Sequence, residues 1–249
     1  MTEEEFEQEV RWYRQAIVEA VAHADPRFSW RSEVPALFTR FETLAQDDLI
    51  HFHRLCARLL EDEQREVRLG VMKLLSSYGR KDDTLSVLLV QRALKHKDLR
   101  EEALLALMGV RTRVVLAPLL VLAERGYSSA LIMVWRMLQN PWEIERGIAI
   151  ARKYIDAEEY QLREAALFIL QKYSSMEREA ERVLAAVQKY TDELFIDALK
   201  KAPPTVVLEP LKALRSTIEE KYGEYRYLSS TIRVLEQKKR EADEQKKVD

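Results

Sequence analysis

The segments VRLGVMKLL (67–75), LREEALLAL (99–107) and LREAALFIL (162–170) decide the fold of this 249-residue chain. Each opens with an apolar residue and an arginine and continues as a leucine-rich run, which favours a helix. The second segment begins 32 residues after the first, and the third begins 63 residues later, close to two further steps of 32. Either the arginines contact a ligand or this sequence motif marks a recurring structural unit. The regular spacing favours the second explanation.

Two further segments resemble this motif less closely and continue the repeat along the chain. SALIMVWRML (129–138) and LFIDALKKA (194–202) begin near the expected positions but lack the arginine. A further helical segment is predicted between successive copies, at 83–96, 113–125, 142–154 and 177–190. Units of 20–50 residues with two helices each cannot bury their apolar faces alone, so they stack on their neighbours. We therefore predict an all-α fold in which the helices form an extended α–α superhelix, or solenoid.

Helical periodicity covers almost the whole chain. The copies of the motif lie in helices predicted at 64–78, 98–109, 127–139, 158–173 and 192–201. Other helices are predicted at 3–23, 34–45, 47–61, 206–221 and 224–246. Residues expected to take the left-handed conformation after a helix are Gly79, Gly126 and Asn140. Side-chain oxygens that can cap helix starts are expected at Asp47–Asp48, Asp82–Asp83 and Thr191–Asp192.

The repeats resemble those of the HEAT-like (ARM-type) helical repeat proteins. In that family the second helix often opens with an acidic residue followed by an aliphatic–arginine pair, as in DLREEALLALMGV (98–110), YQLREAALFILQKY (160–173) and REVRLGVMKLLSSYG (65–79). The resemblance covers about residues 47–202 and implies that arginines of adjacent units pair with acidic residues. The repeat-tying arginines would be Arg68, Arg100 and Arg163, with acidic residues available at Asp62, Asp98 and Glu158–Glu159.

The chain divides into four predicted segments. We expect an N-terminal helical cap at 1–46, the repeat solenoid at 47–202, a C-terminal helical segment at 205–235 and a charged tail at 236–249 that frays or stays disordered. Apolar residues spaced by three and four form a seam in the C-terminal segment: Leu211, Leu214, Ile218, Tyr225, Leu228, Ile232 and Leu235. This seam either caps the end of the solenoid or pairs with a partner or a second copy, which would give a homodimer.

Composition excludes several classes of protein. Lys and Arg number 40 and Asp and Glu 42, so the net charge of −2 provides no global field to attract nucleic acid or an anionic membrane. The longest apolar-rich run, at 114–123, is too short to cross a bilayer. A single cysteine, Cys56, and an acidic start without the features of a secretion signal indicate a cytoplasmic protein. The single asparagine, Asn140, fits a thermophilic source.

A basic stretch provides the strongest alternative function. Arg92, Lys95, Lys97, Arg100, Arg111 and Arg113 outnumber the acidic residues between them, and His96 lies in the same stretch. On a concave surface these cations could neutralise the phosphates of a nucleic acid. A solvated face of mixed charge explains the same residues without a ligand, and we prefer that interpretation.

Three other groups of residues suggest chemistry or recognition. HFHRLC (51–56) contains His51, His53 and Cys56, too few ligands for a zinc site, and Cys56 falls on an apolar helix stripe where a buried thiol is inert. A Lys–Tyr pair ends three predicted helices, at Tyr154, Tyr173 and Tyr190. These tyrosines either form a recognition row or cover the ends of the core, and we prefer the second interpretation.

A fainter resemblance raises an enzymatic alternative. YQLREAALFILQKY and ELFIDALKKA (193–202) look like helices of the bacterial alkylpurine DNA glycosylases, which are built from HEAT-like repeats. That family places tryptophans beside a catalytic aspartate, whereas HKDLREEALLAL (96–107) contains Asp98 without a neighbouring tryptophan. We transfer no catalytic residue and expect no enzyme activity, cofactor or metal. We expect a scaffold or adaptor that binds a protein partner through the solenoid surface, with nucleic-acid binding or DNA processing as the alternative.

Overall fold

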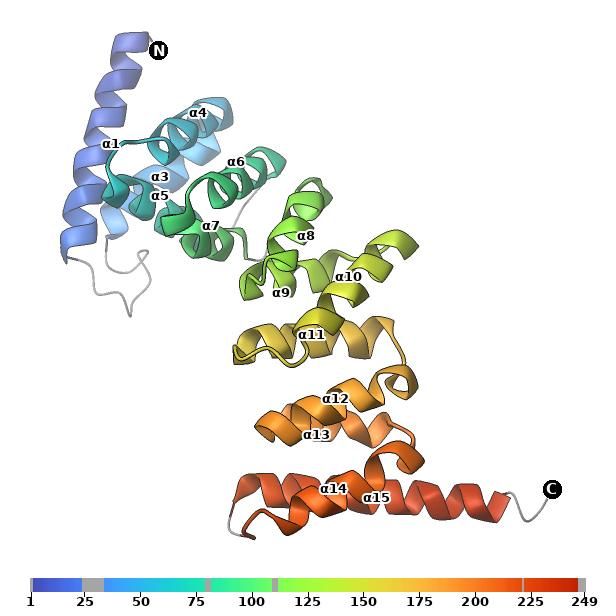
Figure 1. Ribbon diagram of the computed structural model, residues 1–249. Coiled ribbons are helices and arrows are strands. Elements are labelled where there is room, and N and C mark those ends of the chain that lie inside the picture. Colours follow the sequence, from blue (N-terminus) through green and yellow to red (C-terminus); the bar gives the residue numbers. More distant parts are fainter. Residues whose placement is uncertain (1, 24–33, 79–81, 109–111, 221, 246–249) are drawn as a thin grey trace. The chain divides into compact units, whose positions relative to one another are not determined.

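The computed structural model describes residues 2–23, 34–78, 82–108, 112–220 and 222–245. Over these ranges the chain forms fourteen α-helices and three 3-10 helices, and it contains no strand (Figure 1). The prediction of an all-α fold is therefore confirmed. The chain divides into two compact units, unit 1 at Met1–Leu122 and unit 2 at Ala123–Asp249, and each is described by itself.

Unit 1 is built from long helices and short 3-10 turns. In chain order these are α1 (Glu3–His23), α3 (Pro35–Asp47), α4 (Leu49–Leu60), α5 (Arg65–Ser77), α6 (Asp83–Lys95), η1 (Lys97–Leu99), α7 (Arg100–Leu107) and η2 (Arg113–Val115). Helix α8 (Leu116–Glu124) crosses the boundary between the units. Helices α3 and α5 pack on α4, whereas α7 packs on both α5 and α6. The aromatic rings of Tyr13, Phe41, Phe52 and Tyr78 meet in the core at centroid distances of 4.7–6.4 Å.

Unit 2 continues the same pattern. Its helices are α9 (Ser128–Met137), α10 (Pro141–Tyr154), α11 (Tyr160–Tyr173), α12 (Met176–Tyr190), α13 (Glu193–Ala198), η3 (Leu199–Lys201), α14 (Pro204–Ser216) and α15 (Gly223–Gln245). Helix α11 packs on α9, α10, α12 and α13. Helix α12 also packs on α14, and α13 on α15. A helix in this unit thus contacts its neighbours both one and two places along the chain.

The fourteen predicted helices correspond in order to the fourteen observed ones. The differences lie at the ends. The predicted helices at 98–109 and 113–125 each begin with a 3-10 turn, and the predicted helix at 192–201 ends with one. Periodicity alone does not reveal these turns, because 3-10 turns are common at the ends of α-helices and keep nearly the same spacing of apolar residues.

The predicted helix caps are confirmed at two sites. The Asp48 carboxylate accepts a hydrogen bond from the backbone N–H of His51, and the Asp82 carboxylate accepts one from Leu85, both at 2.9 Å. Gly126 takes the predicted left-handed conformation with φ at 89°. A side chain at Gly126 would also crowd the Tyr154 ring, since a Cβ atom there would lie 3.2 Å from the hydroxyl oxygen.

At two other predicted helix ends the observed backbone conformation or cap differs from the prediction. Asn140 is not left-handed: its φ is −85°, and it begins α10, where the Glu143 carboxylate accepts its backbone N–H at 3.1 Å. Pro141 at the first turn of α10 favours this helix start, because its fixed φ suits that position. Thr191 carries the left-handed conformation after α12, with φ at 56°, while Asp192 makes no side-chain cap. Gly79 lies outside the described residues.

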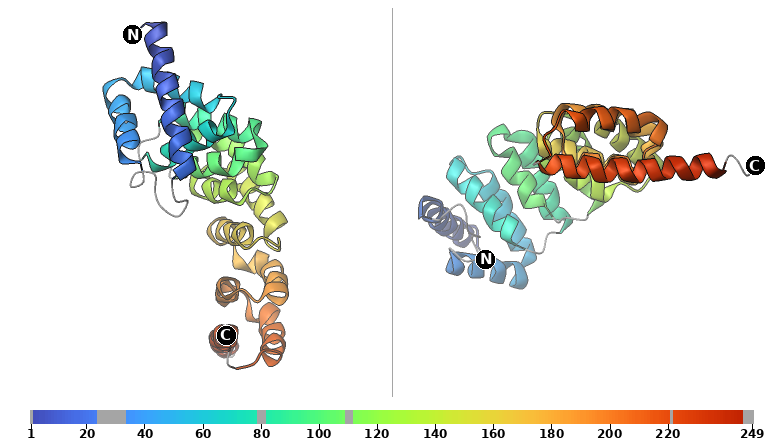
Figure 2. Two further views of the ribbon diagram at one scale, coloured as in Figure 1. Left: turned by 90° about the vertical axis from the view of Figure 1, so that its left-hand side faces the viewer. Right: turned by 90° about the horizontal axis from the view of Figure 1, so that it is seen from below.

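The C-terminal helices bury most of their apolar seam within unit 2. Leu211 of α14 and Leu228, Ile232 and Leu235 of α15 are all buried. Helices α14 and α15 lie side by side, and the last turns of α15 project beyond α14 (Figure 2). The other three residues of the seam, Leu214, Ile218 and Tyr225, are half-buried, and the choice between capping and pairing stays a prediction.

Helix α15 continues to Gln245, through much of the segment expected to fray or stay disordered at 236–249. Two contacts hold its middle. Lys212 pairs with Glu236 at 3.0 Å, and the Lys238 ammonium donates to the Lys200 carbonyl at 2.9 Å. Residues 246–249 lie outside the described part. None of the described helices combines the length and the apolar character needed to span a bilayer.

Candidate functional site

Two of the three repeat-tying arginines share one local geometry. Arg68 Nη1 donates to the carbonyls of Asp62 and Glu63, at 2.6 and 2.9 Å. Arg163 Nη1 donates to the carbonyls of Ala157 and Glu158, both at 2.8 Å. In each case the guanidinium folds back from the first turn of a helix onto carbonyls five or six residues earlier.

Arg100 also donates to preceding backbone carbonyls, but from Nε and Nη2 and to residues seven and six positions earlier. Its side chain is buried, and Nη2 donates to the Leu94 carbonyl at 3.3 Å while Nε donates to Ala93. Both carbonyls lie in the last turn of α6, where a helix leaves its acceptors without partners. The recurring arginine therefore satisfies backbone at the preceding connection, and this contact could not be read from the spacing of charges.

An acidic residue about one repeat further on meets two of these arginines. Asp192 Oδ2 accepts from Arg163 at 2.7 and 3.0 Å, and Asp98 Oδ2 lies 3.8 Å from Arg68 Nη2. Of the acidic residues named from the sequence, Asp98 is thus near one of the arginines, whereas the Asp62 carboxylate pairs with Arg14 at 2.6 Å. These contacts are the ones a tie between repeats requires, and that role stays a prediction to be tested by substitution.

The three Lys–Tyr pairs also contact earlier helices. Tyr154 donates to the carbonyl of Glu124 at 2.7 Å, Tyr173 to that of Leu138 at 3.0 Å, and Tyr190 to that of Asp156 at 3.1 Å. These acceptors lie at or just beyond the C-terminal ends of α8, α9 and α10, so each tyrosine reaches the helix two places before its own. Lysine suits such a site because the C-terminal end of a helix carries partial negative charge. Accordingly, the ammonium of Lys153 donates to the same Glu124 carbonyl at 2.9 Å.

The predicted basic surface loses two of its six cations. Arg92 and Arg100 are only 6% and 5% exposed. Arg92 pairs with Glu61, and Arg100 donates to backbone carbonyls of α6. Lys95 and Lys97 are exposed and Arg113 is half-buried. Arg111 lies outside the described residues. The stretch is therefore not a continuous cationic face over the part of it that is described.

The HFHRLC segment separates into structural contacts. His51 Nε2 lies 2.5 Å from Glu9, and His53 Nε2 lies 2.6 Å from Asp82. Cys56 is buried, and burial raises the pKa of its thiol well above the ordinary value. Within the described ranges no group of three or more His, Cys, Asp or Glu side chains is arranged to hold a metal ion.

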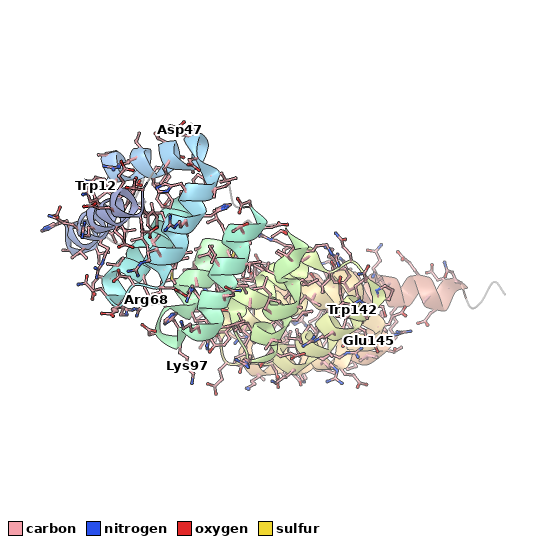
Figure 3. All side chains as sticks on the ribbon, turned by 90° about the horizontal axis from the view of Figure 1, so that it is seen from above. Trp12, Asp47, Arg68, Lys97, Trp142 and Glu145 are labelled. Carbon is pink, nitrogen blue, oxygen red and sulfur yellow. The ribbon has the colours of Figure 1, made fainter. Side chains whose placement is uncertain are left out.

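A groove in unit 1 has the form of a binding site. Two cavities of about 640 and 420 Å³ adjoin each other, since both are lined by Pro35 and Ala36. Helix α1 lines them with Glu9, Trp12, Ala16, Glu19, Ala20 and His23, all on one helix face. Helix α3 forms the other wall, from Pro35 to Asp47. Figure 3 shows Trp12 on α1 and Asp47 at the far end of α3. We call this hollow the α1–α3 groove.

A cation–aromatic pair lies where the two cavities meet. The guanidinium carbon of Arg40 is 3.8 Å from the centroid of the Trp12 ring, a distance at which the ring face attracts a cation. Arg40 Nη2 lies 3.7 Å from Glu9 Oε1. Trp12 is 40% exposed, so the groove presents a large aromatic surface to solvent.

Buried side chains contact the residues that line the groove. His51 holds the Glu9 carboxylate, and Tyr13 packs edge-to-face against Trp12 at 4.9 Å. Burial raises the pKa of Tyr13 above its ordinary range, and the nearby Arg40 opposes that rise. The Tyr13 hydroxyl is buried and meets no hydrogen-bond partner of suitable geometry among the described residues. The polar groups of the groove are thus positioned by a packed core.

Mostly apolar walls with a few fixed polar groups are what a binding site needs, because the walls provide affinity and the polar groups provide orientation. The sequence predicts a helical cap at 1–46 but does not predict this groove. One sequence feature could have indicated the groove. The spacing of Trp12, Ala16 and Ala20 places a tryptophan and two small residues on one face of a helix.

Comparison with known proteins finds no matching family model, no similar curated protein and no similar solved structure.

Proposed function

We propose that this chain is an α-solenoid of HEAT-like two-helix repeats and a non-enzymatic scaffold or adaptor that binds a protein partner. The observation that carries the proposal is the α1–α3 groove, an apolar hollow with an exposed tryptophan and a stacked arginine. The single cysteine, Cys56, favours a reducing, cytoplasmic setting.

The contacts between helices support a repeated unit. Tyr154, Tyr173 and Tyr190 each donate to a carbonyl at the end of the helix two places earlier. Arg163 donates to an aspartate 29 residues further on. Contacts that recur two helices apart are expected when equivalent helices of successive two-helix units stack on each other.

The groove favours a protein as the partner. Tryptophan and arginine are the residues most enriched at the energetic centres of protein interfaces, and both lie in the middle of this hollow. The two cavities follow the faces of two helices rather than forming a closed chamber, which suits a segment of chain laid along them.

Nucleic-acid binding, with DNA processing, is the alternative. It rests on Lys95, Lys97, Arg111 and Arg113, because Arg92 and Arg100 are buried. Binding that depends on phosphate contacts weakens steeply as salt rises. The alternative therefore makes a different prediction about ionic strength from the protein-binding proposal.

The test is to identify the partner and rebuild the complex. The full chain is used to capture proteins from the source organism, and each captured protein is then purified and titrated against the chain at 50 and 200 mM salt. Duplex and single-stranded DNA are titrated in parallel. We expect a purified protein to bind more tightly than either DNA at both salt concentrations. Tight binding of DNA that falls steeply with salt, with no protein reconstituted, would replace the proposal by the nucleic-acid alternative.

A further inference from the structure

The two walls of the α1–α3 groove are similar in length. At 1.5 Å per residue, the wall of α1 from Glu9 to His23 is about 21 Å long, and the wall of α3 from Pro35 to Asp47 is about 18 Å. Each wall is one face of a helix, because its lining residues recur at intervals of three and four. Taken together, the two cavities extend along about four turns of each helix, a length that matches a bound helix of about four turns.

Small residues leave room for such a helix. Ala16 and Ala20 lie on the α1 wall, and Ala36 lies on the α3 wall, where it lines both cavities. Ala36 and Pro35 are exposed, so the hollow is open to solvent at this point. Large apolar side chains of a bound helix can enter the cavities above these alanines, as amphipathic helices do in hydrophobic grooves.

The charged residues around the hollow indicate which charge a bound helix would carry. Among the described residues that line it are three carboxylates, those of Glu9, Glu19 and Asp47, the guanidinium of Arg40 and the imidazole of His23. Arg40 is stacked on Trp12 and already lies near Glu9. The carboxylates of Glu19 and Asp47 belong to exposed residues on opposite walls. Glu19 and Asp47 therefore place one exposed carboxylate on each wall, and these two carboxylates complement a basic ligand.

We propose that the α1–α3 groove binds a basic amphipathic helix of the partner protein. The apolar stripe of that helix lies over Ala16, Ala20 and Ala36, and its lysine or arginine side chains face Glu19 and Asp47. This inference rests on the proposed function, in which the partner is a protein, and it adds the chemistry of the segment that is recognised.

The test uses two labelled peptides of about 18 residues and the full chain. Both peptides carry leucine at intervals of three and four, and the remaining positions are mainly lysine in one and glutamate in the other. Fluorescence anisotropy measures the affinity of each. We expect saturable binding of the lysine peptide and affinity for the glutamate peptide that is at least about tenfold weaker.

Two substitutions locate the binding. Ala36→Trp places a large side chain where the cavities meet. It should lower the affinity of the chain for the lysine peptide at least about tenfold. The matched control is Ala185→Trp, at an exposed alanine of α12 that lines neither cavity, and it should leave the affinity unchanged. Thermal melting followed by circular dichroism verifies that both variants fold.

Charge reversal tests the selectivity. The double variant Glu19→Lys, Asp47→Lys should bind the glutamate peptide more tightly than the lysine peptide, the reverse of the natural chain. The control double variant Glu177→Lys, Glu181→Lys makes the same change at two exposed residues of α12 and should keep the original preference.

Equal affinity for the two peptides, or no effect of Ala36→Trp, overturns the inference. The proposed function fails in a different way. If a captured protein binds the natural chain and the Ala36→Trp variant equally, the scaffold proposal stands and the groove is not its site. If the chain binds DNA and no protein, the proposed function itself falls.

Discussion

At the scale of single residues, arginine side chains that suggested ligand contacts bind the chain itself. Arg163 is the clearest case, since it donates to two backbone carbonyls and to Asp192, and its guanidinium lies 3.8 Å from the Tyr190 ring centroid. Every polar atom that it contacts would lose a donor if the side chain were removed. The cost of such a loss exceeds the value of the contact, because a buried acceptor is then left without a partner.

Arg163→Ala should therefore lower the free energy of unfolding by about 3 kcal/mol, the usual loss when one partner of a buried ion pair is removed. Arg100→Ala should lower the thermal stability as well. The matched control is Arg178→Ala, an exposed residue of α12, which should change stability by less than about 0.5 kcal/mol. Urea unfolding followed by circular dichroism measures all three. Loss of partner binding by Arg163→Ala without loss of stability would show that the arginine serves recognition.

Tyr154→Phe should cost about 1 kcal/mol, because it removes one hydrogen bond to the Glu124 carbonyl and keeps the ring. Tyr160→Phe is the control: Tyr160 is 45% exposed, and its hydroxyl makes no hydrogen bond to the described residues. The same unfolding measurement applies. Equal effects of the two substitutions would contradict the role of the Lys–Tyr pairs as contacts between helices.

At the scale of helices, α12 is fastened to α10 by a buried charge. Glu179 of α12 is fully buried, and Arg152 Nη2 of α10 lies 2.5 Å from its Oε1, while the Ser174 hydroxyl donates at 2.8 Å. Burial raises the pKa of Glu179, but the hydrogen bonds from Arg152 and Ser174 outweigh burial and lower it below its ordinary value of 4.5. The folded chain thus holds the ionised form.

A lowered pKa in the folded state stabilises the protein above the unfolded pKa and loses that contribution as pH falls through the folded value. The natural chain should therefore lose stability below about pH 4.5, the ordinary value for this carboxyl group. Glu179→Gln should be less stable at pH 7 by about 2 kcal/mol and should show a weaker loss on acidification. Urea midpoints at pH 7, 5 and 3 measure this. Parallel pH curves for the two proteins would exclude the Glu179–Arg152 contact as their cause.

The order and length of the helices could be predicted because apolar residues recur every three or four positions along nearly the whole chain. Other features depend on contacts that periodicity does not contain. Arg92 is buried, and its guanidinium pairs with Glu61, 31 residues away in the chain. Asn140 begins a helix rather than ending one, because Pro141 and Glu143 favour the start of α10. The α1–α3 groove arises from the spacing of two helices, which no local pattern records.

At the scale of the whole molecule, the burial of residues in the C-terminal seam affects whether two copies of the chain can form a dimer. Leu228, Ile232 and Leu235 are covered by the chain's own helices, so they offer no apolar stripe for a second copy. Light scattering on the full chain should therefore give the mass of a monomer, about 29.2 kDa. A concentration-dependent dimer that disappears when exposed residues of α15 are changed would restore the alternative of pairing through the C-terminal helices.

We propose that the chain binds a protein partner in the α1–α3 groove. Hydrogen–deuterium exchange of the full chain, with and without the purified partner, tests this claim most directly, because it reports on each backbone segment without any substitution. We expect new protection concentrated at residues 9–23 and 34–47, the two walls of the groove. Protection confined to other helices, with these two segments unchanged, would contradict it.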